Sequence, residues 1–213
     1  MEILDQSLLK DCSGKVDGMI VYKVGNKTYA RRMPDEIRDP KSEKQLVQRE
    51  RFPAVQAFYQ SVKNCILKDI NDLAARDAGR RSGYHLFMHF NIMAFGKDNF
   101  IDYSLLHLAH GSQQLAYNLN LIAANGARAE FAWMDNSSSV TAQGSDRLMV
   151  AVVFDDDPYR VVMLDGVNAR RKDERALLVL PEGDWKEAHL YCFFGTDDRK
   201  RFSPSVYFKV TKP

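Results

Sequence analysis

The chain has 213 residues, of which 45% are hydrophobic and 27% charged, and its formal net charge is +2. This composition excludes a largely disordered chain and is typical of one large folded domain or two smaller ones. The net charge is too small for the whole surface to bind nucleic acid, so an electrostatic partner must be met by a local patch.

The sequence predicts neither export nor a membrane partner. Residues 1–7 carry acids where a signal peptide has a basic start, and no stretch approaches the roughly 18 apolar residues of a membrane span. The cysteines Cys12, Cys65 and Cys192 are odd in number and far apart, which favours a reducing compartment over a disulfide framework. We therefore expect a cytoplasmic protein.

Residues 15–33 predict a basic β-hairpin that contains aromatic residues. Two runs rich in Val, Ile, Tyr and Thr flank Gly25-Asn26, and these two residues suit the positive φ that a tight hairpin turn requires. Pro34 and Pro40 then interrupt extended structure. We expect the hairpin to be followed directly by a polar helix.

Three helical segments are expected next. Ser42 can cap a helix that starts at the following residue, and Pro53 should end or kink it because proline lacks the amide hydrogen. Residues 54–75 place apolar side chains three and four apart, which predicts a second helix with one apolar stripe. Residues 84–95 predict a third helix after a short loop.

From residue 99 onward, short β-rich runs alternate with turn residues. Such spacing is typical of a two-layer antiparallel β-sandwich of the fibronectin or immunoglobulin kind, and the immunoglobulin disulfide is absent. We expect an α+β fold with a hairpin and helices in residues 1–100 and the sandwich in residues 101–213. The predicted strands cover residues 102–108, 115–123, 129–134, 148–154, 160–164, 176–180, 188–194 and 206–210.

A series of motifs extends along nearly the whole chain: Gly14-Lys15-Val16, Tyr22, Gly25, Tyr29, Arg31, Pro34, Asp39-Pro40, Gln45, Gln48-Arg49, Phe52, Phe131-Ala132-Trp133-Met134-Asp135-Asn136, Asp146-Arg147 and Ser205-Val206-Tyr207. In this order the motifs resemble an uncharacterised Bacteroidetes family of unknown function, the one numbered 6266. The resemblance implies no activity, cofactor or catalytic residue. Asp17 departs from the family pattern, which has a glycine there, and an acidic stretch at residues 155–157 replaces a simpler turn.

The hairpin and the first predicted helix gather basic and aromatic side chains. Cationic groups neutralise phosphates, aromatic rings stack on bases, and a two-stranded ribbon can enter a major groove. The alternative is that Tyr22 and Tyr29 face a core while the lysines lie in water and protect the hairpin from unwanted pairing. The candidate binding residues are Lys15, Tyr22, Lys23, Lys27, Tyr29, Arg31, Arg32 and Arg49.

No catalytic, metal or cofactor site is expected. His85 and His89 would share one helix face, yet the glutamate that a zinc hydrolase places beside its first histidine is missing. The acidic stretches 155–157 and 197–198 lack the glycine and the bidentate glutamate of a calcium loop. His107 and His110 would point to opposite faces of the strand expected there. Nucleophile elbows, phosphate-binding glycine loops and dinucleotide fingerprints are missing from the sequence.

We therefore expect a non-enzymatic binding or assembly protein. Its hairpin and first helix would contact a protein partner or a second copy of the chain. A nucleic-acid-binding protein that uses the same hairpin is the alternative, and a metal-dependent hydrolase is the third hypothesis.

Overall fold

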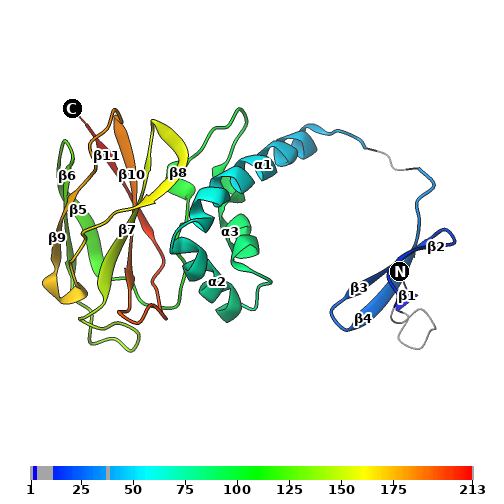
Figure 1. Cartoon of the computed structure of the whole chain (residues 1–213), viewed down its shortest axis with the longest axis horizontal. Helices are drawn as coiled ribbons and strands as arrows, with labels where there is room; N and C mark the ends of the chain where they lie inside the picture. The colour runs from blue at the N-terminus through cyan, green and yellow to red at the C-terminus, as the bar shows by residue number, and fades with distance from the viewer. Residues whose placement is uncertain (1, 4–11, 37–38, 213) are drawn as a thin grey trace. The chain divides into compact units, whose positions relative to one another are not determined.

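The computed structural model describes residues 2–3, 12–36 and 39–212 (Figure 1). Its contacts divide the chain into two compact units, Met1–Ser42 and Glu43–Pro213, each of which is described by itself. Within the described ranges, no helix combines the length and the apolar character that a membrane crossing requires.

The first unit is a four-stranded antiparallel sheet in the order β1-β4-β3-β2. Its strands are β1 (Glu2–Ile3), β2 (Gly14–Val16), β3 (Met19–Val24) and β4 (Lys27–Arg32). The predicted hairpin is confirmed: β3 and β4 pair in register around Gly25-Asn26, and Gly25 has a φ of 61°.

A second tight turn joins β2 to β3. Asp17 has a φ of 41° and Gly18 a φ of 74°, so both central residues are left-handed, as in the turns that match the twist of paired strands. Aspartate tolerates this region better than most residues because its short side chain can hydrogen-bond locally. Asp17, which stands where the family pattern has a glycine, therefore forms a tight turn that a glycine would also allow.

The second unit begins with α1 (Glu43–Lys63), α2 (Leu67–Asp77) and α3 (Gly83–Asn91), followed by the 3₁₀ turn η1 (Ile92–Ala94). The helix does not end at Pro53 as we expected. Val55, Phe58 and Val62, which follow the proline, are fully buried, so tertiary packing outweighs the lost amide bond.

The single helix expected over residues 54–75 is instead two helices. The chain turns between α1 and α2, where the amides of Asn64 and Cys65 donate to the carbonyls three residues earlier, of Ser61 and Val62, at 3.1 and 3.4 Å. This tighter hydrogen bonding ends α1 at Lys63.

Seven strands form the predicted sandwich of the fibronectin or immunoglobulin kind, and the α+β class is confirmed. One sheet has the order β5-β6-β9 and the other the order β11-β10-β7-β8. The strands are β5 (Tyr117–Asn125), β6 (Arg128–Met134), β7 (Arg147–Phe154), β8 (Asp157–Met163), β9 (Arg175–Val179), β10 (Glu187–Gly195) and β11 (Val206–Thr211).

The four-stranded sheet of the sandwich is buried on both faces. Val150 and Cys192 point into the core between the two sheets, whereas their neighbours Ala151, Tyr191 and Phe193 pack in a second core with the helices. The molecule's second unit therefore has three layers, with the helices on the outer face of the larger sheet (Figure 1). Because helices and sandwich share a core, the contacts divide the chain after Ser42 and not at the expected position after residue 100.

The strand expected over residues 102–108 is absent. The described structure has the 3₁₀ turn η2 (Tyr103–Leu105) there, followed by an extended connection. Buried side chains take the place of a neighbouring strand: Asn91 bonds to both backbone groups of His107, and the Ser205 hydroxyl accepts from the Leu108 amide at 3.1 Å. The backbone is satisfied without a sheet ladder.

Candidate functional site

The strand register sorts the side chains of the N-terminal sheet onto two faces. Val21 lies opposite Ala30, and both side chains are buried. Tyr22 lies opposite Tyr29, so this pair occupies the other face because side chains alternate along a strand. The two tyrosine rings stack with their centroids 5.8 Å apart and their planes 22° apart.

We call the face that carries the tyrosine pair the aromatic-basic face. Tyr22, Tyr29 and Ile20 are half-buried on it, and the remaining side chains are exposed. The described strands β2, β3 and β4 contain no acidic residue. By register, strands β2, β3 and β4 contribute Lys15, Ile20, Tyr22, Val24, Lys27, Tyr29 and Arg31 to the face.

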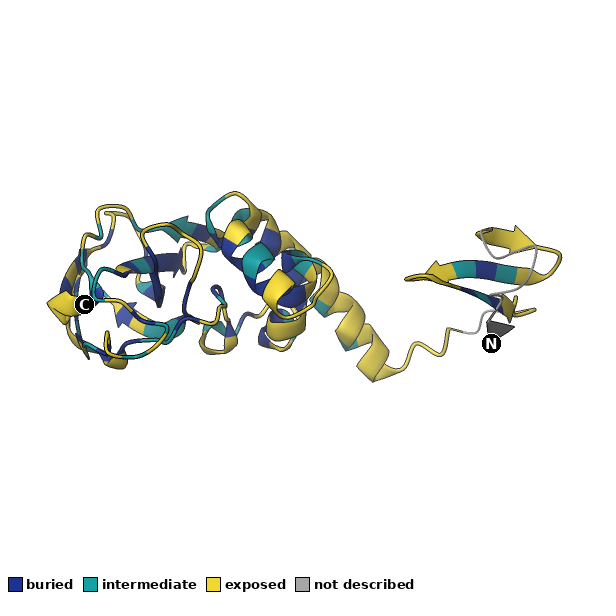
Figure 2. Cartoon of the chain, turned by 90° about the horizontal axis from the view of Figure 1, so that it is seen from below, coloured by how far each residue is buried: buried dark blue, intermediate teal, exposed yellow. Residues whose placement is uncertain are grey.

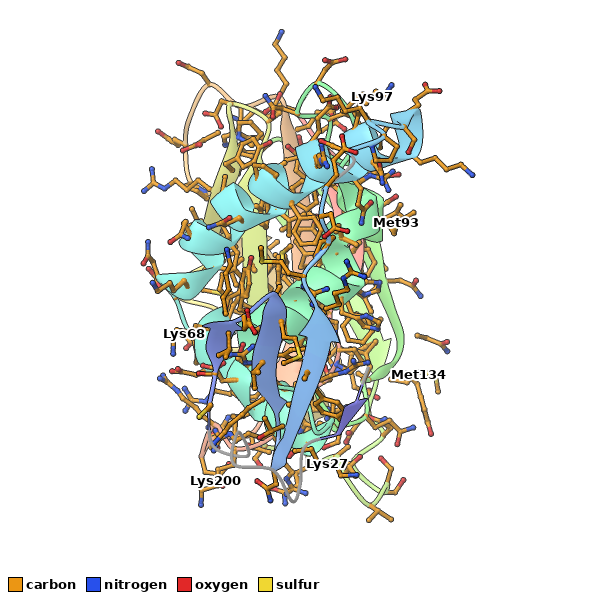
Figure 3. The ribbon with its side chains drawn as sticks, turned by 90° about the vertical axis from the view of Figure 1, so that its right-hand side faces the viewer. Lys27, Lys68, Met93, Lys97, Met134 and Lys200 are labelled. Atoms are coloured by element: carbon orange, nitrogen blue, oxygen red, sulfur yellow. The ribbon has the colours of Figure 1, made fainter. Side chains whose placement is uncertain are left out.

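This face brings together five of the eight residues predicted to bind a partner, namely Lys15, Tyr22, Lys27, Tyr29 and Arg31. Figure 3 shows Lys27 next to the turn of the β3–β4 hairpin. Lys23 and Arg32 lie opposite Thr28 and Met19 and belong to the other face. The alternative hypothesis, in which Tyr22 and Tyr29 face a core, also places both tyrosines on one face. The more deeply buried face of the sheet, however, is the one with Val21 and Ala30.

Arg49, the eighth predicted residue, lies in the second unit, on the first half of α1. This half-helix is largely exposed (Figure 2), with Leu46 42% and Phe52 50% exposed. Arg49 lines a hollow of about 500 Å³ together with Leu46 and Pro53 on the helix and Asp98 on the loop after η1.

A larger hollow, of about 600 Å³, lies beside β7. Among the charged groups that line it, Asp197 accepts hydrogen bonds from Arg147 at 2.6 Å and from Arg170 at 3.3 Å. The bond from Arg147 lowers the pKa of Asp197, and burial raises the pKa of the Cys65 thiol in the same hollow. No histidine lines it. Asp197 is held by two arginines and the Cys65 thiol is protonated, so neither of these two groups is poised as a general base or an activated nucleophile.

The histidines and clustered aspartates considered for metal binding have other contacts. His85 bonds to the Ser82 hydroxyl at 2.8 Å, and His110 stacks on Phe90 with the ring centroids 4.3 Å apart. Asp155 accepts from two backbone amides, those of Lys186 and Glu187. In the described part of the chain, no three His, Cys, Asp or Glu side chains gather with metal-binding geometry.

Sequence reasoning missed a buried polar cluster at one end of the sandwich. Arg171 is fully buried and donates to Asp146 at 3.1 Å, to Asn136 at 2.6 Å and to the carbonyl of Gln114 at 2.9 Å. Its guanidinium also lies 4.5 Å from the centre of the Phe194 ring. Asn136 and Asp146 belong to two of the motifs that resemble the family, so these two motifs have a structural role here. Nothing in the sequence singled out Arg171 from its neighbour Arg170.

The fold and these contacts define a β-sandwich protein that also has a four-stranded N-terminal sheet. Residues 11–209 match the family described as Family of unknown function (DUF6266), and the chain belongs to this family. No curated protein matches the chain.

The chain is also similar to several solved β-sandwich structures. A computationally redesigned β-sandwich protein is 14% identical, and the match covers 47% of this chain and 91% of that chain with a TM-score of 0.33. A structure titled "Myokine structure" is 15% identical over 48% of this chain and 100% of its own, with a TM-score of 0.33. The fibronectin type-III domain of human fibronectin type III domain containing protein 3 is 11% identical over 49% and 90%, with a TM-score of 0.33.

Proposed function

We propose that this protein is a non-enzymatic binding module that contacts a protein partner through the aromatic-basic face. The observation that carries the proposal is the register of β3 and β4, which gathers Tyr22, Tyr29 and Ile20 in the middle of a face with basic residues around them. An aromatic and aliphatic centre inside a polar rim is the usual anatomy of a protein interface.

The charge of the face indicates the chemistry of the partner. Lys15, Lys27 and Arg31 lie on it, and strands β2 to β4 add no acid. A second copy of the same face would place like charges opposite each other, which is unfavourable. The proposed partner is therefore a different protein with an apolar centre and acidic residues around it.

The exposed first half of α1 is proposed as a second contact segment. Leu46 and Phe52 are large apolar side chains that are about half exposed there, with Arg49 between them in the sequence. Exposed aromatic and aliphatic residues next to an arginine are typical of interface anchors.

The test compares two charge reversals of the same size on opposite faces of one sheet. Lys27→Glu with Arg31→Glu changes the aromatic-basic face, and Lys23→Glu with Arg32→Glu changes the other face. Partners captured by the full chain from a lysate of its source cells are identified by mass spectrometry. We expect at least a tenfold loss of the captured partner with the first variant, equivalent to about 1.4 kcal/mol, and retention with the second. Equal loss with both variants would contradict a face-specific contact.

Nucleic-acid binding by the same face is the second candidate, because the tyrosine pair and three cations share it. The sheet has four strands, not two, so its outer strand axes are roughly 14 Å apart. This exceeds the major-groove width of about 12 Å and disfavours groove entry. Affinity for duplex and single-stranded DNA and RNA is measured at about 50 and 200 mM salt. Binding that weakens steeply with salt would favour this candidate over the protein partner.

We also propose that the protein resides in the cytoplasm. The three cysteines have no disulfide partner in the described structure, and Cys12 is exposed, which suits a reducing compartment. Fractionation of the source cells, with detection of the native chain, tests this. Recovery outside the cytoplasmic fraction would overturn it.

A further inference from the structure

Strand β9 is an open edge of the sheet β5-β6-β9 (Figure 1). On one side, β9 is hydrogen-bonded to β6. The two residues that flank β9 show this: the Glu174 carbonyl accepts from the Trp133 amide, and the Leu180 amide donates to the Ala127 carbonyl. Backbone groups alternate along a strand, so those of Arg175, Leu177 and Val179 point away from β6. Outside the ladder with β6, the described residues provide these three with no backbone hydrogen bond.

The side chains of this edge do not protect it. Leu177 is 61% exposed and Val179 60% exposed. Arg175 is the one charged residue of β9, and its guanidinium is 2.7 Å from Glu130 on β6, so its charge is paired within the sheet. Natural edge strands are usually blocked by charged side chains, proline, an inward charge or a bulge. Strand β9 has no proline, inward charge or bulge, and Glu130 neutralises its one charged side chain, Arg175.

We propose that β9 pairs with β9 of a second copy of this chain, antiparallel and with the twofold axis at Leu177. In this register Leu177 lies opposite Leu177 of the partner subunit, and Arg175 lies opposite Val179 of the partner subunit. The outward groups are spaced symmetrically about Leu177, so each outward N–H meets a carbonyl of the other strand. The two three-stranded sheets become one continuous sheet.

Charge selects this register over the one centred on Arg175. Pairing centred on Arg175 would place two arginines directly opposite each other, which is destabilising. Pairing centred on Leu177 places apolar side chains at the axis and leaves both Arg175–Glu130 ion pairs intact. Five-residue strands bury less than the ~1,200 Å² of a stable complex, so the dimer is expected to dissociate in the micromolar range or more weakly.

Sedimentation of the full chain over about 10–500 µM tests the association. We expect the mass to rise from 24.4 kDa towards twice that value. Leu177→Lys should keep the chain monomeric, and Met134→Lys, which changes an apolar residue of the adjacent strand β6 (Figure 3) that is 54% exposed, should leave the dimer unchanged. A wild-type chain that stays monomeric, or a Leu177→Lys variant that still dimerises, would overturn the proposal.

Disulfide formation tests the register, in a background that carries Cys12→Ser. The paired residues at the axis have Cα atoms about 5.5 Å apart, within the range of a disulfide. Leu177→Cys should therefore cross-link at least about tenfold faster than Val179→Cys, which would face Arg175 of the partner subunit. Equal rates would exclude the twofold axis at Leu177. The charge reversals of the aromatic-basic face should leave both experiments unchanged, so failure of one proposal is distinguishable from failure of the other.

Discussion

Arg171 and Asp146 show how single residues fix one end of the sandwich. Both side chains are completely buried, and Arg171 donates to partners from three separate segments. When one partner of a buried ion pair is removed, the other charge is still shielded from water but no longer has the attraction that offset the lost hydration. The indole of Trp133 also donates to the Arg171 carbonyl at 2.6 Å, which adds a second contact from the segment that contains Asn136.

The variant Arg171→Met should therefore lower the free energy of unfolding by about 3–5 kcal/mol. Urea denaturation followed by circular dichroism measures this change. Arg160→Met is the control, since the Arg160–Asp157 pair is exposed and 4.0 Å apart, and it should cost no more than about 1 kcal/mol. Equal effects of the two substitutions would show that the buried pair does not hold the sandwich end.

His189 gives the fold a defined dependence on pH. The residue is 4% exposed, and its ring stacks on Tyr103 with the centroids 3.8 Å apart and hydrogen-bonds to the Tyr207 hydroxyl at 3.0 Å. Burial lowers the pKa of His189 from 6.5 to about 4. The unfolded chain therefore binds a proton near pH 6.5, whereas the folded chain does so only near pH 4. Stability is lost as the pH falls through this interval.

The loss should reach about 3 kcal/mol at most between pH 7 and pH 4, because one pKa unit corresponds to about 1.4 kcal/mol. His189→Gln should reduce this pH dependence, and the exposed His89→Gln serves as the control. Urea denaturation at pH 7, 5.5 and 4.5 measures the slope. Burial also lowers the pKa of His110 to about 4, so part of the slope should persist in His189→Gln. An unchanged slope in His189→Gln would contradict the assignment.

At the scale of elements, the connection between the helices and the sandwich depends on buried amides. Asn91 donates to the carbonyls of Phe87 and His107 and accepts from the His107 amide at 2.7 Å. Asn71 similarly bonds to the carbonyls of Leu67 and Leu108. These side chains replace the neighbouring strand that the extended segment lacks.

Asn91→Leu should cost about 2–4 kcal/mol of unfolding free energy, because it removes three hydrogen bonds and leaves buried backbone groups of His107 unpaired. Asn64→Leu changes an exposed asparagine at the end of α1 and should alter the stability by less than about 0.5 kcal/mol. Thermal and urea denaturation of both variants measure the difference. A loss below 1 kcal/mol for Asn91→Leu would mean that the connection is held by other contacts.

The elements that could be predicted are those whose signals are local. Turn residues such as Gly25-Asn26 delimit the strands, and alternation within the hairpin separates Tyr22 from Lys23 whatever the rest of the fold does. The strand predicted over residues 102–108 was wrong because the contacts of Asn91 and Ser205 lie far away in sequence. The buried ion pair of Arg171 was missed for the same reason.

The extra layer of helices left a signal in the sequence. The runs of β7 and β10 are almost continuously apolar, which is typical of strands buried on both faces. Alternating strands such as β6, by contrast, belong to a sheet with one exposed face. The sequence did not predict that Arg49 and the hairpin belong to different compact units.

At the scale of the whole molecule, the two units have separate cores. The hydrophobic clusters of the second unit include no described residue of the first, whose buried side chains are Val21, Thr28 and Ala30. A binding surface built on the smaller unit can therefore change without changing the core of the sandwich. This separation has a measurable consequence for stability.

Val21→Asp should disrupt the N-terminal sheet, because it places an unpaired carboxylate at a position that is 1% exposed. Both tryptophans of the chain, Trp133 and Trp185, belong to the second unit, so tryptophan fluorescence reports its unfolding alone. The fluorescence-detected Tm of Val21→Asp should lie within about 2 °C of the wild type. Leu190→Ala, which truncates a fully buried side chain of β10, should lose about 2–5 kcal/mol and lower that Tm by several degrees. A comparable shift in both variants would show that the two units unfold as one.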